Sequence, residues 1–164
     1  YCSGIAQAVG LSRSRNRRVQ LAALLHNIGL LFLPTDEANR ADEDEAVDKK
    51  RIELACELLE GIQGMSFLVP AVRHHRERWD GKGYPDALKG EDIPLEARII
   101  SIANDFDLLI AKASEAGEDL STKDAAKRLV ELDKDRYDPA VVEGLLTAHT
   151  EGWLYKPQER VKVK

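Results

Sequence analysis

The segment from residue 94 to residue 114 constrains the fold most, because it carries two apolar stripes at helical spacing. The first stripe consists of Leu95, Ile99, Ile102, Phe106, Leu109 and Ala113, and the second, almost opposite, of Ala97, Ile100, Asn104, Asp107 and Ala111. A helix that is apolar on two faces is typical of the centre of a helical bundle. Asn104 and Asp107 are polar members of the second stripe, so we expect them to have buried partners.

Helical periodicity also dominates the rest of the chain. Apolar residues recur every three to four positions over residues 15–28, where Gly29 would end the helix, and again over residues 52–62. A short third helix is predicted over residues 66–76. No alternating apolar and polar run of strand length occurs, and we therefore expect an all-α fold.

Further boundary signals complete this assignment. Ser121 and the Asp138–Pro139 pair are N-terminal caps of two later helices. The acidic stretch over residues 36–48 is typical of a solvated loop, with a cation or partner site as the alternative. Cys56 lies in an apolar stripe, which predicts a buried and unreactive thiol.

Composition excludes several classes of protein. The 164 residues are 43% hydrophobic and 32% charged, with a formal net charge of −5. This balance argues against a nucleic-acid binder, and no apolar run is long enough to cross a membrane. With two cysteines and no leader-like segment, the cytoplasm is the expected compartment. We expect one domain over residues 1–150, lacking its N-terminal part, and a polar basic tail over residues 151–164.

Three histidines are candidate metal ligands. His26 lies in a Leu- and Ala-rich helix, and His74 and His75 are adjacent. Imidazole nitrogens are common ligands of divalent metals. A histidine on an apolar helix is more often a core residue, and adjacent histidines on a helix face different directions, so the residues alone leave both readings open.

The segment that follows resembles the HD-GYP family of the HD superfamily. The resemblance rests on His74-His75-Arg76-Glu77-Arg78-Trp79-Asp80-Gly81-Lys82-Gly83-Tyr84-Pro85 and on the string from Leu88 to Ile100. It implies an HD-domain-like helical bundle with a GYP-containing extension. It also implies a metal-dependent phosphohydrolase that acts on cyclic di-GMP through a bi- or trinuclear centre containing iron or manganese.

Several residues depart from the family pattern. The family's His-Asp doublet reads His26-Asn27 here, its next ligand histidine falls on Arg51, and a ligand aspartate falls on Asn104. These changes move the charge around the metals by about +3 and remove the bridging carboxylate. We therefore expect no metal, or a single divalent ion held by His26, His74 and His75, and no binuclear centre.

The resemblance and the departures together predict a degenerate domain with a regulatory or protein-interaction role and no catalytic residues. A residual phosphohydrolase acting on cyclic di-GMP or a related nucleotide is the alternative. A receptor without turnover is less favoured, because Ala113 and Ala116 occupy the family's basic phosphate-contact positions.

The Gly-Tyr-Pro loop either fixes the chain between two helices or serves as a docking surface. The expected docking residues are Arg78, Asp80, Gly83, Tyr84 and Pro85. The family resemblance suggests a protein partner such as a diguanylate cyclase (GGDEF), sensor or receiver domain, with no nucleic acid and no membrane.

Overall fold

The computed structural model describes residues 1–41 and 43–154, and all regular structure in these ranges is helical, which confirms the all-α fold. Most of the predicted tail, residues 155–164, lies outside the described residues. The elements are α1 (Cys2–Ala8), α2 (Arg13–Leu25), η1 (Ile28–Phe32), α3 (Thr35–Ala38), α4 (Glu45–Gly61), η2 (Ser66–Leu68), α5 (Val69–Arg73), η3 (Gly90–Asp92), α6 (Leu95–Glu115), α7 (Thr122–Leu132) and α8 (Pro139–Thr150).

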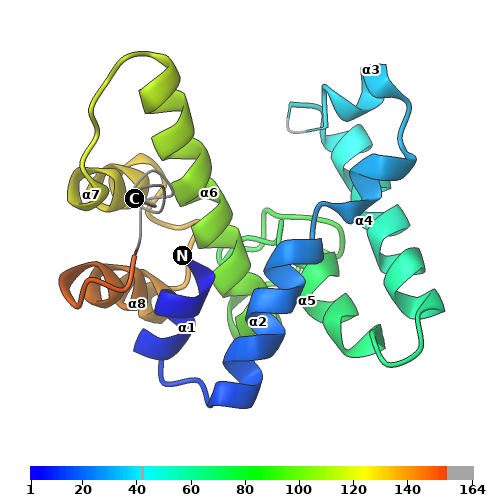
Figure 1. Cartoon of the computed structure of the whole chain (residues 1–164), viewed down its shortest axis with the longest axis horizontal. Coiled ribbons are helices and arrows are strands. Elements are labelled where there is room, and N and C mark those ends of the chain that lie inside the picture. The colour runs from blue at the N-terminus through cyan, green and yellow to red at the C-terminus, as the bar shows by residue number, and fades with distance from the viewer. Residues whose placement is uncertain (42, 155–164) are drawn as a thin grey trace, which may run out of the picture.

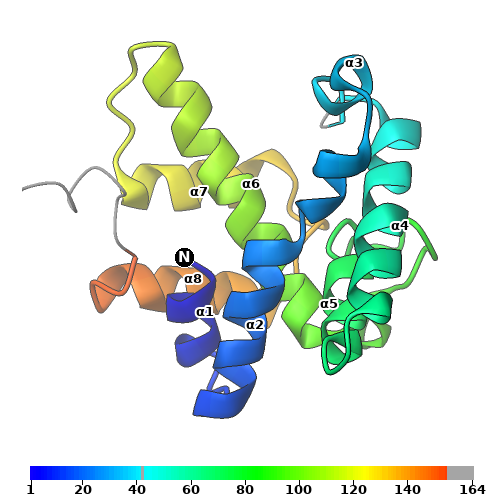
Figure 2. The same ribbon diagram turned by 45° about the vertical axis from the view of Figure 1, so that its right-hand side comes forward.

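Helix α6 is the central element, as its two apolar stripes predict. It contacts α1, α2, α5, α7 and α8. Figure 1 shows it running between the α7–α8 side of the molecule and the α2–α5 side, and Figure 2 shows the same order from a second direction. Ile99, Ile102 and Phe106 are completely buried. The second stripe is buried only at its start, since Asp107 and Ala111 are exposed.

The predicted caps of the last two helices are present. The Ser121 hydroxyl accepts a hydrogen bond from the Asp124 amide at 3.1 Å. The Asp138 carboxylate accepts one from the Ala140 amide at 2.8 Å, ahead of Pro139 at the first helical position. Each cap satisfies an amide that has no partner within its own helix.

Helix α2 is shorter than predicted, and Gly29 does not end it. The α-helix ends at Leu25, and Gly29 lies within the 3-10 turn η1. A Cβ atom at Gly29 would lie well inside the van der Waals distance of the Arg51 carbonyl oxygen. Gly29 is therefore needed for the close approach of η1 to α4.

The predicted third helix is also interrupted. Residues 66–68 form η2, and α5 ends at Arg73. Nδ1 of His75 donates a hydrogen bond to the Val72 carbonyl at 2.6 Å. In a longer helix this carbonyl would accept a hydrogen bond from the Arg76 amide. The histidine pair therefore follows α5 and does not lie within it.

The acidic stretch is only partly a loop. Asp44 caps α4 by accepting from the Ala46 amide at 3.0 Å, and α4 starts at Glu45. Asp48 lies inside α4 with 1% of its surface exposed, so the solvated-loop prediction is wrong for this residue. The buried Arg51 and the partly buried Arg76 pair with Asp48, and charge density alone does not reveal them.

The buried face of α4 agrees with the sequence analysis. Cys56 is buried as predicted, and burial raises the pKa of its thiol to about 11. None of the helices within the described ranges combines the length and the apolar character that a bilayer crossing requires.

The packing of Gly29 can be tested by a single methyl group. Gly29→Ala should lower the free energy of unfolding by about 2 kcal/mol or more, because the backbone of α4 must move away. Gly61→Ala is the matched control, since a Cβ there meets nothing within 4 Å. Urea unfolding followed by circular dichroism measures both, and equal stabilities of the two variants would contradict the prediction.

Candidate functional site

Four separate segments bring the predicted site residues together. His26 and Asn27 follow α2, Arg51 lies on α4, His75 follows α5, and Asn104 lies on α6. The rings of His26 and His75 meet edge to face with their centroids 5.1 Å apart. Two of the three candidate histidines are therefore 49 positions apart in the chain and adjacent in space.

Both histidines are oriented as neutral imidazoles. Nδ1 of His26 donates to the Ala23 carbonyl at 2.7 Å, and Nδ1 of His75 donates to the Val72 carbonyl at 2.6 Å. Each Nε2 then carries a lone pair, and each is buried without a hydrogen-bond partner among the described residues. Metal-ligating histidines commonly have this arrangement, in which one nitrogen is fixed by a carbonyl.

Burial and nearby cations keep these rings uncharged. Burial is the main cause that lowers the pKa of His26, and the Arg51 guanidinium lowers it further. The pKa of His75 lies well below its usual value, because the ring is fully buried and His26, Arg76 and Arg51 are close to it.

His74 does not join this pair. Its Nδ1 donates to the Pro70 carbonyl at 2.8 Å, and its Nε2 lies 3.0 Å from Asp86. Arg73 donates to both oxygens of the same carboxylate. The structure therefore uses His74 to attach the loop after Pro85 to α5, and it does not assemble a set of three histidines.

Arg51 lies in the centre of the site. Its side chain is 1% exposed and its guanidinium donates to the Asn27 amide oxygen and pairs with the Asp48 carboxylate. The side-chain oxygen of Asn27 therefore faces the positive charge of the Arg51 guanidinium.

Asp48 is the residue that sequence reasoning missed. Besides Arg51, it accepts from Arg76 Nε at 2.9 Å and from the Tyr84 hydroxyl at 2.6 Å. Asp48 and Arg51 are three positions apart on α4, a spacing that favours an ion pair, but the apolar pattern predicts this helix only from residue 52 and the acidic run predicts a loop at Asp48. The Arg76 contact depends on tertiary structure and left no such signal.

A second carboxylate extends the network. Asp105 lies 2.7 Å from Arg136 Nη2 and 3.7 Å from Arg76 Nη1, and it accepts from the Tyr137 hydroxyl at 2.9 Å. The charges therefore alternate along a series that we call the Arg–Asp ladder. The ladder consists of Arg51, Asp48, Arg76, Asp105 and Arg136.

These residues do not fit a divalent metal centre. His26 and His75 supply two suitable nitrogens, but within residues 1–41 and 43–154 no three His, Cys, Asp or Glu side chains are placed to share an ion. Asp48 and Asp105, the nearby carboxylates, are paired with arginines. The positive charge that carboxylates would balance in a metal site is already supplied by guanidinium groups.

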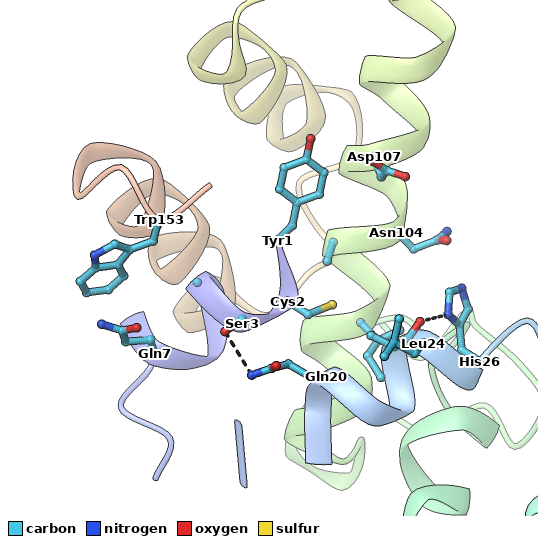
Figure 3. Close-up of a pocket in the computed structure, with 14 residues that line it drawn as sticks. Tyr1, Cys2, Ser3, Gln7, Gln20, Leu24, His26, Asn104, Asp107 and Trp153 are labelled. Carbon is cyan, nitrogen blue, oxygen red and sulfur yellow. Dashed lines mark hydrogen bonds between the residues drawn. The ribbon is translucent and has the colours of Figure 1, made fainter. Parts of the chain in front are cut away.

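A pocket of about 800 Å³ lies next to His26, which is one of the residues that line it. Residues of α1, α2 and α6 line it, together with Trp153. Figure 3 shows Asn104 and Asp107 on one wall, from α6, with His26 at the end of α2 and Tyr1 beside Asp107. Asn104 therefore faces this pocket together with His26, while Arg51 and His75 are buried.

The Gly-Tyr-Pro loop is fixed by internal contacts. Arg78 donates to Asp80 at 3.0 and 2.9 Å and to Asp133 at 2.6 Å. A Cβ atom at Gly83 would collide with the backbone of Glu77 and Arg78. Pro85 follows Tyr84 through a cis peptide bond. Most of the residues expected to dock a partner therefore have a structural task as well.

The chain was compared with known families and proteins. The profile described as "HD domain" matches residues 1–141. The cyclic di-GMP phosphodiesterase response regulator RpfG of Xanthomonas campestris pv. campestris is 39% identical over 150 residues, which is 87% of this chain and 39% of that protein. The 3'3'-cGAMP-specific phosphodiesterase 2 of Vibrio cholerae is 34% identical over 89% of this chain and 29% of its own length. The chain thus spans less than half of these relatives.

Solved structures agree on the fold. The cyclic GMP-AMP-specific phosphodiesterase V-cGAP3 of V. cholerae superposes with a TM-score of 0.67 at 18% identity, covering 91% of this chain and 42% of that one. An HDG"Y"P protein of Bdellovibrio bacteriovorus, Bd1817, has a TM-score of 0.65 at 24% identity, covering 88% and 47%. At these identities the likeness supports the shared fold alone.

The lowered pKa of His75 predicts an acid-sensitive fold. The folded state keeps this ring neutral, while the unfolded chain takes up a proton below pH about 6.5, so stability is full above that pH and falls below it. The slope should reach about 1.4 kcal/mol per pH unit for a buried neutral histidine. Urea unfolding between pH 7.5 and 5 measures this slope.

Two variants test whether the buried histidines cause the pH dependence of the free energy of unfolding. His75→Gln should reduce the slope, and the double variant His26→Gln, His75→Gln should reduce it further, because burial also lowers the pKa of His26. An unchanged slope in His75→Gln would show that this ring does not account for the acid sensitivity.

Proposed function

Because the chain belongs to the HD-GYP family of HD domains, we propose that it is a non-catalytic regulatory or protein-interaction domain in cyclic-dinucleotide signalling. The position of the Arg51 guanidinium carries this proposal. It lies between Asn27 and Asp48 and beside His26 and His75, where the resemblance to the family implies metal ions.

Electrostatics supports this proposal. A divalent ion about 5 Å from a guanidinium would meet a repulsion of about 7 kcal/mol at an effective dielectric constant of about 20. Asn27 and Asn104 lack the charge that would offset this repulsion. Asp48 is already held by Arg51 and Arg76, so releasing it for a metal would take the carboxylate partner from the buried Arg51.

Two family positions for phosphate contact also lack donors. Ala113 is buried and Ala116 ends α6, and neither alanine side chain can hydrogen-bond a phosphate oxygen. We propose that cyclic-dinucleotide signalling reaches this domain through a protein partner, since both the metal and the phosphate positions are changed.

A direct assay tests the absence of catalysis. The purified domain, exposed anaerobically to Fe²⁺ or Mn²⁺, should convert neither cyclic di-GMP nor 3'3'-cGAMP to linear products above a protein-free blank. The Xanthomonas relative, assayed in parallel, controls the conditions. Metal-dependent product formation by this domain would overturn the proposal.

A restored site sharpens the test. The triple variant Asn27→Asp, Arg51→His, Asn104→Asp removes one positive charge and adds two negative ones, and it should bind more Mn²⁺ than the wild type by elemental analysis. Equal metal content in both proteins would show that these three positions are not what limits metal binding.

Residual metal-dependent phosphohydrolase activity is the second candidate. The two Nε2 atoms of His26 and His75, buried and without hydrogen bonds, favour it. Such an enzyme would work with a single ion, and the assay above would detect it.

The proposed partner is a protein domain of a sensor, receiver or diguanylate cyclase (GGDEF) type, and we place the contact on the Gly-Tyr-Pro loop. The loop is held rigidly by Arg78 and Tyr84 from inside, while Lys82 is exposed. A rigid loop with exposed charged residues loses little conformational entropy on docking. We place the protein in the cytoplasm, where such partners act.

A further inference from the structure

We infer that the Arg–Asp ladder is a side-chain cross-link that holds the helices of the site together without a divalent ion. The inference concerns folding and loop order, and it goes beyond the proposed function. It predicts that neither the stability of the fold nor the order of the Gly-Tyr-Pro loop changes when metal ions are added or removed.

The ladder connects segments that are distant in the chain. Arg51 and Asp48 lie on α4, Arg76 follows α5, Asp105 lies on α6, and Arg136 precedes α8. Arg51 also reaches Asn27 at the end of α2. One continuous series of polar contacts therefore joins α2, α4, α5, α6 and the α7–α8 connection.

Each carboxylate of the ladder is held in the same way. Asp48 has two arginines and the Tyr84 hydroxyl, and Asp105 has two arginines and the Tyr137 hydroxyl. Burial raises the pKa of both tyrosines well above the usual value, so both hydroxyls stay protonated and donate. Arg76 belongs to both sets and makes the two halves one network.

The charges of the ladder balance almost completely. Three arginines face two aspartates, and the adjacent His26 and His75 are neutral. A divalent ion with its carboxylates serves the same purpose in a metal site, namely to compensate buried charge and fix several elements at once. Here the compensation comes from residues on neighbouring helices.

The ladder also fixes the Gly-Tyr-Pro loop. Tyr84 attaches the loop to Asp48, and Lys49 lies 5.3 Å from the centre of the Tyr84 ring. At the other end, the Trp79 amide donates to the Arg136 carbonyl at 2.9 Å, and Arg78 pairs with Asp133. The loop is therefore attached to both ends of the same network.

Thermal unfolding tests independence from metal. The midpoint of the wild-type domain should agree within about 1 °C in excess EDTA, in metal-free buffer and in 1 mM Mn²⁺ or Fe²⁺, because ions that bind only the folded state raise the midpoint. A rise of several degrees with metal, or a fall with EDTA, would overturn the inference.

Substitutions test the ladder itself. Asp48→Asn should lower the midpoint by about 10 °C, because it leaves the buried Arg51 and the partly buried Arg76 without that carboxylate. Glu118→Gln is the matched control, since it makes the same change in an exposed ion pair with Arg128, and it should shift the midpoint by less than about 2 °C. Equal shifts in the two variants would overturn the inference.

Coupling between the two carboxylates distinguishes a network from two separate pairs. Because Arg76 contacts both aspartates, the midpoint shifts of Asp48→Asn and Asp105→Asn should not add in the double variant. Additive shifts would overturn the shared network. If the double variant does not fold, Tyr84→Phe and Tyr137→Phe, singly and together, provide a milder cycle.

Hydrogen exchange reports the effect on the loop. Asp48→Asn should raise the exchange rate of the Asp86 and Leu88 amides, which donate to the buried Glu77 carboxylate, by at least tenfold. Unchanged protection would show that the ladder does not order the loop. None of these readouts depends on catalysis, and the substitution and exchange tests do not depend on metal binding either, so they can fail while the proposed function stands.

Discussion

The buried carboxylate of Asp48 is the interaction on which the rest of the site depends. This carboxylate lies on α4 and contacts both the segment after α5 and the Gly-Tyr-Pro loop. A carboxylate with 1% exposure is stable only when its charge is compensated and its oxygens are hydrogen-bonded. Arg51 and Arg76 compensate its charge, and its Oδ2 accepts hydrogen bonds from Arg76 and Tyr84.

The same contacts explain why the site combines metal-type histidines with a cation of its own. His26 and His75 are held in the ligand tautomer by backbone carbonyls, and this geometry depends on the local turns and not on a metal. Arg51 then supplies the positive charge at the centre. The site therefore combines two histidines in the ligand tautomer with a guanidinium placed between Asn27 and Asp48.

The sequence predicted the fold well because apolar periodicity, Ser121 and Asp138 act locally, and the structure places α6 and both caps where they are expected. It also identified His26, Asn27, Arg51, His75 and Asn104 as one constellation, through the family resemblance. The same resemblance adds His74 to this set, whereas in the structure its ring contacts the Pro70 carbonyl and Asp86. Asp48 and Arg76 were missed because their pairing is created only when α4 and α5 pack together.

The sharing of Arg76 between two aspartates has a consequence for how a single substitution spreads through the site. Removing Arg51 leaves Asp48 paired with Arg76, so each aspartate of the ladder keeps a cation. Removing Arg76 takes a cation from Asp48 and from Asp105 together, because its guanidinium lies within ion-pair distance of both. One side chain therefore couples the electrostatic state of α4 to that of α6.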